Sequence, residues 1–100
     1  MKPPYYAVIF TSVQTPETEG YAQMSIAMED LAKKQPGYLG IEHARSEIGI
    51  TISYWDSLNA IKLWKENLEH TKAQQKGIEK WYQWYKVKIC KVEHAYEFSK

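Results

Sequence analysis

The three histidines supply the side chains of this chain that titrate near neutral pH, and His70 has the most suggestive neighbours. Gln74 follows it by one helical turn, so the two side chains would share one face of a helix. Aromatic residues stand on either side of this pair: Trp64, Trp81, Tyr82 and Tyr85. A histidine in such surroundings could ligate haem iron or shuttle a proton for an aromatic substrate. It could equally be a surface residue of a polar helix, with the tryptophans in the core.

His43 and Arg45 form a second candidate site, because residues two apart in a strand share one face. The same face would carry Leu39 and Ile41, whereas Tyr38 would lie on the other. In a sheet-lined cavity, an imidazole and a guanidinium could hold an anionic or phenolate substrate. The alternative is a solvated strand end, or an ion pair with a glutamate of a neighbouring chain.

The third histidine, His94, is typical of an exposed or interface strand residue.

The absence of several motifs from the sequence argues against a number of enzyme classes. No glycine-rich phosphate loop precedes a helix, and neither HExxH nor paired metal-ligand spacing occurs. The serines lack the context of a nucleophile elbow. An enzyme built on this chain would therefore carry out redox chemistry on an apolar ring, or use a bound cofactor.

Composition indicates one globular domain over residues 1–100. A formal net charge of +1 gives no electrostatic case for nucleic acid or membrane as a partner. Cys90 is the single cysteine, so no intrachain disulfide can form, and we expect a cytoplasmic protein. Four tryptophans and eight tyrosines, against two phenylalanines, suit a ligand site or a subunit interface as well as a core.

Hydrophobic periodicity predicts an α+β domain. Residues 5–13 read as a strand, and residues 17–35 as a helix with Tyr21, Met24, Met28 and Leu31 on its buried stripe. Thr15 or Thr18 would cap that helix. The remaining elements are a hairpin of strands 38–46 and 49–55, a helix capped by Asp56 or Ser57 with Leu58, Ile61, Trp64 and Leu68 buried, and a strand over residues 85–98. Together these elements give a strand–helix–strand–strand–helix–strand order with a four-stranded sheet.

Two helices can cover only one face of such a sheet. The last strand also changes its apolar face midway, which predicts a bulge or a strand that continues onto a partner. We therefore expect a homodimer packed sheet against sheet.

Four segments together resemble the antibiotic biosynthesis monooxygenase domain family, over about residues 5–98: FTSVQT (10–15), QPGYLGIEHAR (35–45), GITISYWDSLNAIKLWKENLEH (49–70) and KVEHAYEF (91–98). The resemblance implies a ferredoxin-like fold with a four-stranded antiparallel sheet. It also implies a homodimer in which two sheets form an α+β barrel, with a pocket between sheet and helices in each subunit. Members of the family include cofactor-independent monooxygenases that act on polyphenolic rings and haem-degrading monooxygenases, and many other members have no established activity.

The haem-degrading branch typically has an Asn on the first strand, a Trp on the second helix and a ligand His about ten residues later. Trp64 matches that Trp, but Gln74 stands at the ligand position and the first strand has no Asn. For the ring-oxidising branch, Trp64, Tyr54 and His43 are compatible residue types.

We therefore expect a monooxygenase-like protein that oxidises a small phenolic substrate without a cofactor. His70 or His43 would act as the base beside Trp64. The predicted substrate-binding residues are Tyr54, Arg45, Gln74, Trp81 and Tyr85. A non-enzymatic ligand-binding or stress-related module is the alternative, and haem binding through His70 is a further one.

Overall fold

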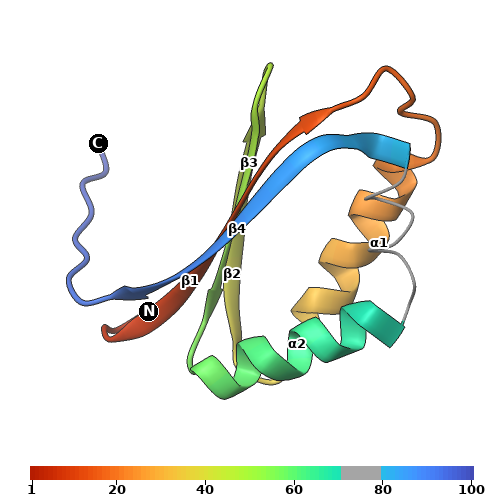
Figure 1. The fold of residues 1–100 in the computed structure, drawn as a ribbon. Helices are drawn as coiled ribbons and strands as arrows, with labels where there is room; N and C mark the ends of the chain where they lie inside the picture. The colour runs from red at the N-terminus through yellow and green to blue at the C-terminus, as the bar shows by residue number, and fades with distance from the viewer. Residues whose placement is uncertain (71–79) are drawn as a thin grey trace.

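The computed structural model describes residues 1–70 and 80–100 and has the predicted strand–helix–strand–strand–helix–strand order. Both helices lie on one face of the sheet (Figure 1). This arrangement confirms the ferredoxin-like α+β fold. The elements are β1 (Tyr5–Gln14), α1 (Tyr21–Lys33), β2 (Tyr38–Arg45), β3 (Gly49–Trp55), α2 (Leu58–His70) and β4 (Tyr82–Val92).

The sheet is antiparallel, with strand order β2-β3-β1-β4. Tyr6 pairs with Trp55, and Val8 pairs with both Ser53 and Ile89. Because side chains alternate along a strand, this register sends the even-numbered residues of β1 to the helix side of the sheet. The odd-numbered residues of β1 point to the opposite side, which no described helix covers (Figure 1).

The β2–β3 hairpin forms as predicted, and Gly37 leads into it. Gly37 has φ 85°, a left-handed conformation in which glycine has no steric cost. Its carbonyl accepts a hydrogen bond from the Asp56 amide at 2.9 Å. The start of β2 is thereby tied to the end of β3, just before α2 begins.

The predicted buried stripe of α1 is confirmed, since Tyr21, Met24, Met28 and Leu31 are each partly buried. The predicted start and cap are wrong. The helix begins at Tyr21 after Gly20, which has φ 83° and provides no side-chain cap.

Thr15 makes long-range contacts instead of capping α1. Its hydroxyl donates to the Lys80 carbonyl at 2.7 Å and accepts from the Glu17 amide at 3.2 Å.

The core lies where α2 meets β3. Trp55 is fully buried and packs with Ala32, Ala60 and Ile61. Ser57 caps α2, as predicted, by accepting a hydrogen bond from the Ala60 amide at 3.1 Å.

The expectation that Leu58 belongs to the buried stripe of α2 is wrong, because Leu58 is 55% exposed. Ala60 takes the buried place beside Ile61.

Two sheet irregularities correct the expected faces. A register shift between Tyr38 and Gly40 leaves Leu39 unpaired, so Tyr38 lies on the helix side and packs against Trp55 at 5.7 Å between ring centroids. Tyr38 therefore shares the face of His43 and Arg45, not the opposite one.

The final strand is Tyr82–Val92 and not residues 85–98. Val92 pairs with Tyr5, the first residue of β1, so β4 has no strand beside it beyond this point. Residues 93–100 leave the sheet as an extended tail (Figure 1). Tyr96 and Phe98 in this tail are 97% and 89% exposed.

Candidate functional site

Four aromatic side chains meet on the helix side of the sheet; we call Phe10, Tyr21, Tyr82 and Tyr85 the tyrosine cluster. The ring of Phe10 stacks on Tyr85 at 5.3 Å and meets Tyr82 edge-on at 5.4 Å. Tyr21, the first residue of α1, meets Tyr82 edge-on at 5.9 Å. The cluster therefore joins β1, β4 and the first turn of α1.

A bulge brings the two tyrosines of β4 together. Residues three apart in a regular strand point to opposite faces, so Tyr82 and Tyr85 would be separated. The register shifts between Val13 and Gln14, with Val13 opposite Trp84 and Gln14 opposite Tyr82. This shift turns Tyr82 to the side of Tyr85, and their rings lie 5.9 Å apart.

Arg45 reaches the edge of this cluster from the end of β2. Its Nη2 donates a hydrogen bond to the Ser12 hydroxyl at 2.6 Å, and its guanidinium carbon lies 5.7 Å from the centre of the Tyr21 ring. Ser12 is fully buried. Gly49, opposite Arg45 in the register, leaves room for this side chain, because a Cβ there would overlap the guanidinium group.

The hydroxyl groups of the cluster are also linked. The Tyr82 hydroxyl donates to the Tyr21 hydroxyl across 3.5 Å. Burial first, and then this hydrogen bond, hold the pKa of Tyr82 well above its ordinary value, whereas Arg45 acts in the lowering direction. Tyr82 is therefore a neutral hydroxyl at physiological pH, able to donate a hydrogen bond but not to act as a base.

Trp81, predicted to bind substrate, packs against Tyr21 of the tyrosine cluster. It is 5% exposed, and its Nε1 donates to the Glu19 carbonyl at 2.9 Å. Its ring meets Tyr21 edge-on at 5.7 Å. Trp81 therefore holds the start of α1 against the sheet, and the face of Tyr21 remains beside Arg45.

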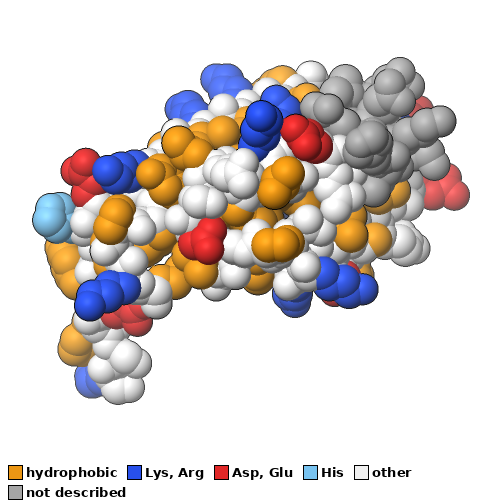
Figure 2. Space-filling view, turned by 90° about the horizontal axis from the view of Figure 1, so that it is seen from below, with side chains coloured by type: hydrophobic (Ala, Val, Ile, Leu, Met, Phe, Trp, Pro, Cys, Tyr) orange, Lys and Arg blue, Asp and Glu red, His pale blue; other side chains and the backbone are white. Residues whose placement is uncertain are grey.

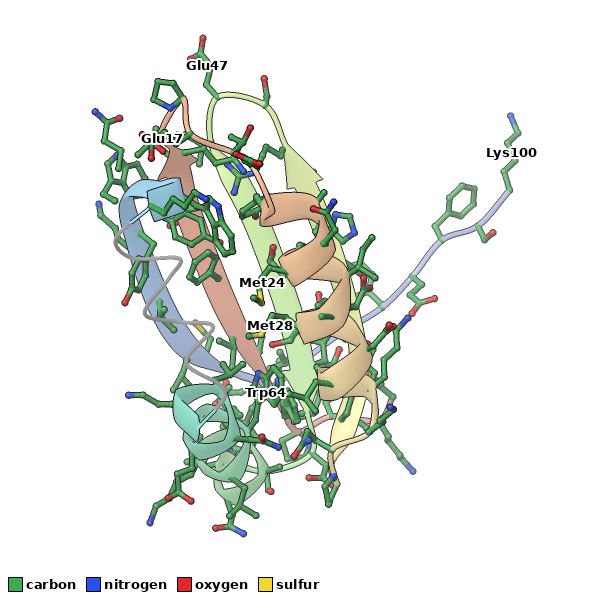
Figure 3. All side chains as sticks on the ribbon, turned by 90° about the vertical axis from the view of Figure 1, so that its right-hand side faces the viewer. Glu17, Met24, Met28, Glu47, Trp64 and Lys100 are labelled. Carbon is green, nitrogen blue, oxygen red and sulfur yellow. The ribbon has the colours of Figure 1, made fainter. Side chains whose placement is uncertain are left out.

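Trp64, predicted to be catalytic, lies in the core and not in the tyrosine cluster. Its ring stacks on Trp55 at 5.9 Å with an interplanar angle of 25°. Figure 3 shows Met24 and Met28 on the sheet-facing side of α1, with Trp64 beyond them towards α2. The two methionines thus stand between Trp64 and the start of α1, where Tyr21 lies.

Tyr54 lies on the opposite face of the sheet. Its hydroxyl donates to a Glu42 carboxylate oxygen at 3.4 Å, and its ring meets Tyr5 edge-on at 5.8 Å. Burial, followed by the charge of Glu42, raises its pKa. The predicted grouping of Tyr54 with Arg45 and Tyr85 is therefore wrong.

The histidines are placed unequally. His43 pairs with Thr51 in the sheet and shares the helix side with Arg45; it is exposed, and its imidazole has no hydrogen-bond partner among the described side chains and backbone. His94 lies in the exposed tail. The side chain of His70 and all of Gln74 fall outside the described residues.

The haem hypothesis rests on His70, whose side chain lies outside the described residues. No group of three potential metal-ligating side chains occurs among the residues that the structure describes. An axial histidine is normally held by a hydrogen bond to its second ring nitrogen, which His43 lacks within the described ranges. Likewise, neither α1 nor the described α2 is both long and apolar enough to cross a membrane.

Sequence reasoning found Arg45 and Tyr85 but missed three partners: Phe10, Ser12 and Tyr21. Phe10 and Ser12 are two residues apart on β1 and therefore share one face, and Gly49 lies opposite Ser12 on the neighbouring strand. Small residues beside an arginine on adjacent strands were the available signal. No comparable sequence pattern indicates the bulge that turns Tyr82 to the side of Tyr85.

As a chemical unit, the cluster offers aromatic faces, tyrosine hydroxyls and one guanidinium group. On β4, Val87 pairs with Phe10 of β1, and Ile89 pairs with Val8. Val87 and Ile89 are 49% and 52% exposed, so apolar surface remains open beside the rings. Such a combination suits a flat aromatic molecule with polar substituents.

Comparisons with known proteins identify the relatives of this chain. No protein-family model matches it. It is 45% identical over 100 residues to YqjZ of Bacillus subtilis, an uncharacterised protein, covering 98% of this chain and 88% of YqjZ.

The solved structures that share the fold include the following two. SnoaB from Streptomyces nogalater, described as a cofactor-independent oxygenase, superposes in a mutant form with a TM-score of 0.79 at 7% identity, covering 93% of this chain and 97% of SnoaB. A Nitrosomonas europaea protein named as a candidate antibiotic biosynthesis monooxygenase gives a TM-score of 0.72 at 13% identity, covering 92% and 94% of the two chains. The chain therefore belongs to the family of YqjZ, and it has the fold of the antibiotic biosynthesis monooxygenases that its sequence resembles.

Proposed function

We propose that this chain is a cytoplasmic, homodimeric monooxygenase that binds a small phenolic molecule at the tyrosine cluster and oxidises it without a cofactor. The observation that carries the proposal is the meeting of Phe10, Tyr21, Tyr82 and Tyr85 beside Arg45 on the helix side of the sheet. The shared fold with SnoaB, described as a cofactor-independent oxygenase, supports the same reaction type.

The chemistry needs only a bound phenol, a base and dioxygen. Deprotonation gives a phenolate, which passes one electron to dioxygen and forms a phenoxyl radical and superoxide. These recombine at a ring carbon, and loss of water leaves a quinone, so that one phenol and one dioxygen give one quinone and one water. His43 is the described histidine on the correct face to accept the first proton, and Arg45 would stabilise negative charge on the ring.

Oxygen consumption with a panel of simple phenols tests the proposal. Tyr85→Leu removes the ring that stacks on Phe10 and should lower kcat/KM by about tenfold, the scale of one aromatic contact. Tyr96→Leu is the matched control, because Tyr96 is 97% exposed in the tail. Equal rates for the two variants, or no phenol-dependent oxygen uptake by the wild type, would remove the proposed reaction.

The proposed homodimer would cover the face of the sheet opposite the helices. Ile50 on this face is 43% exposed, and Ile9 and Ile52 lie beside it in the register. Glu42 on β2 and Lys88 on β4 occupy this same face at opposite edges of the sheet. Packing two copies about a twofold axis would bury the isoleucines and can bring opposite charges together.

Sedimentation velocity tests the dimer with a pair of variants. Ile50→Glu should give monomers, because it places a charge in the apolar surface that the dimer would bury. Ile26→Glu should stay dimeric, since Ile26 is 61% exposed on α1, on the other side of the sheet. A wild-type monomer at micromolar concentration would refute this part of the proposal.

A non-enzymatic binding module is the second candidate, and the placement of His43 favours it. Within the described residues, no hydrogen bond orients this imidazole, whereas a catalytic base is normally held in position. Saturable binding of phenols without oxygen consumption would establish this candidate and exclude the first.

A further inference from the structure

Arg45 is a fixed cation without an acidic partner in the described part of the chain. Among residues 1–70 and 80–100, the one ion pair joins Lys33 and Glu29 at 4.0 Å, on α1. Glu47, in the β2–β3 turn near Arg45, points away from the sheet (Figure 3). The charge of Arg45 is therefore available to a ligand.

The guanidinium group is held in place rather than free to rotate. One N–H bonds to the fully buried hydroxyl of Ser12, and the guanidinium carbon lies over the Tyr21 ring, 5.7 Å from its centre. A guanidinium has five N–H donors, so several remain after the bond to Ser12. Because the side chain is already ordered, a ligand that binds it loses little side-chain entropy.

The position next to the tyrosine cluster defines what this cation can recognise. Tyr21 contacts Arg45 with its ring and contacts Tyr82 at 5.9 Å, so one ring separates the guanidinium from the centre of the cluster. A carboxylate presents two oxygens that match the planar fork of an arginine, whereas a phenolate presents one. A single positive charge suits a monoanion.

We propose that Arg45 is the subsite for a carboxylate on the aromatic ligand, so the substrate class is hydroxylated aromatic acids. This inference rests on the proposed function, because the tyrosine cluster must first hold the ring. Gly49 serves the subsite by leaving the space that the guanidinium occupies.

Isothermal titration calorimetry with two probes of equal shape tests the subsite. 4-Hydroxybenzoate carries the carboxylate, and 4-hydroxybenzamide replaces it with a neutral amide. The wild type should bind the acid about tenfold more tightly than the amide, the scale of a charge-assisted hydrogen bond. Arg45→Gln should reduce this ratio to about one.

Two further variants sharpen the test. Lys86→Gln removes a cation that lies 5.3 Å from the Trp84 ring on the same sheet but away from the cluster, and the ratio should stay at about ten. Gly49→Ala keeps the charge of Arg45 but displaces its guanidinium, so the ratio should fall although the net charge is unchanged. A wild-type ratio near one, a ratio unaffected by Arg45→Gln, or an absence of binding would overturn the subsite.

The binding ratio and oxygen consumption fail separately. An intact ratio without oxygen uptake would leave the carboxylate subsite standing and remove the oxidation. Oxygen uptake with phenols, combined with equal binding of 4-hydroxybenzoate and 4-hydroxybenzamide, would leave the oxidation standing and remove the carboxylate subsite.

Discussion

Replacing Gly37 with alanine should strongly destabilise the fold, because both the backbone conformation and the close packing at this position are unfavourable for a side chain. Its φ of 85° lies in the left-handed region. A Cβ at this position would also lie 2.5 Å from Oδ1 of Asp56 and 2.6 Å from Cβ of Ala60. Ala60 belongs to the core, so this crowding cannot be relieved by a flexible side chain alone.

The magnitude follows from adding the two costs. A left-handed conformation costs a non-glycine residue about 1–2 kcal/mol. Overpacking against a core element costs about 1–3 kcal/mol. The free energy of unfolding should therefore fall by about 2–5 kcal/mol, a large fraction of the stability of a small domain. With m of about 1–2 kcal/mol/M, this corresponds to a midpoint shift of about 1–5 M in urea.

Urea unfolding followed by tryptophan fluorescence measures this change, because Trp55 is fully buried in the adjacent core. Gly40→Ala is the matched control: Gly40 lies in β2, three residues further on, and a Cβ there meets no atom within 4 Å. Gly37→Ala should therefore lower the midpoint by about 1–5 M, and Gly40→Ala should leave it almost unchanged. All variants are compared at one protein concentration, since association shifts apparent stability. Equal midpoints for the two variants would refute the reasoning.

Three further predictions use other contacts. Ser53→Ala removes the acceptor of the buried Trp55 Nε1, now 2.9 Å away, and should lower the free energy of unfolding by about 1–3 kcal/mol in the same urea assay. Because the pKa of Tyr82 is raised in the folded state, unfolded tyrosine ionises first as the pH rises past about 10, and the fold loses stability there; Tyr82→Phe should show a smaller loss between about pH 8 and pH 11. Titration with haemin should give no saturable Soret band, and a band at one haem per subunit that is lost in His70→Ala would contradict this expectation.

The fold was largely predictable because its signals are local. Pro36 and Gly37 end a helical segment, and Gly49 with the alternating pattern of the next run defines the hairpin. Ser57 caps α2 through its own neighbours along the chain. In each case, residues within a few positions of one another determine the element, so a reader of the sequence has the necessary information.

The errors fall where distant segments decide the outcome. Thr15 has the residue type of a helix cap, but its hydroxyl bonds to the carbonyl of Lys80, 65 positions away. The bulge at Leu39 is hidden because apolar residues occupy both faces of that run, and no period-two pattern can locate it. The strand expected over 85–98 ends at Val92 because β1 begins at Tyr5, after two prolines that have no backbone N–H to offer.

The candidate site was only partly predictable for the same reason. The sequence places Trp64, His70 and Gln74 close together along the chain, but proximity along the chain is not proximity in the fold. Trp64 packs into the core with Trp55, whereas Arg45 meets residues of β1 and α1 that are distant from it in the sequence. The surface seen from below shows no dominant feature either, with apolar side chains dispersed among charged ones (Figure 2).

The different hydrogen-bonding capacities of tryptophan and tyrosine side chains account for the position of the candidate site. An indole has one N–H, and both buried tryptophans use it internally: Trp55 donates to Ser53 and Trp81 donates to the Glu19 carbonyl. Neither ring then has polar capacity left for a ligand. A tyrosine hydroxyl both donates and accepts, so the bond between Tyr82 and Tyr21 leaves further acceptor sites and one donor hydrogen. Trp55 and Trp81 therefore stabilise the fold, and the tyrosines beside Arg45 retain the hydrogen-bonding capacity that a polar aromatic ligand requires.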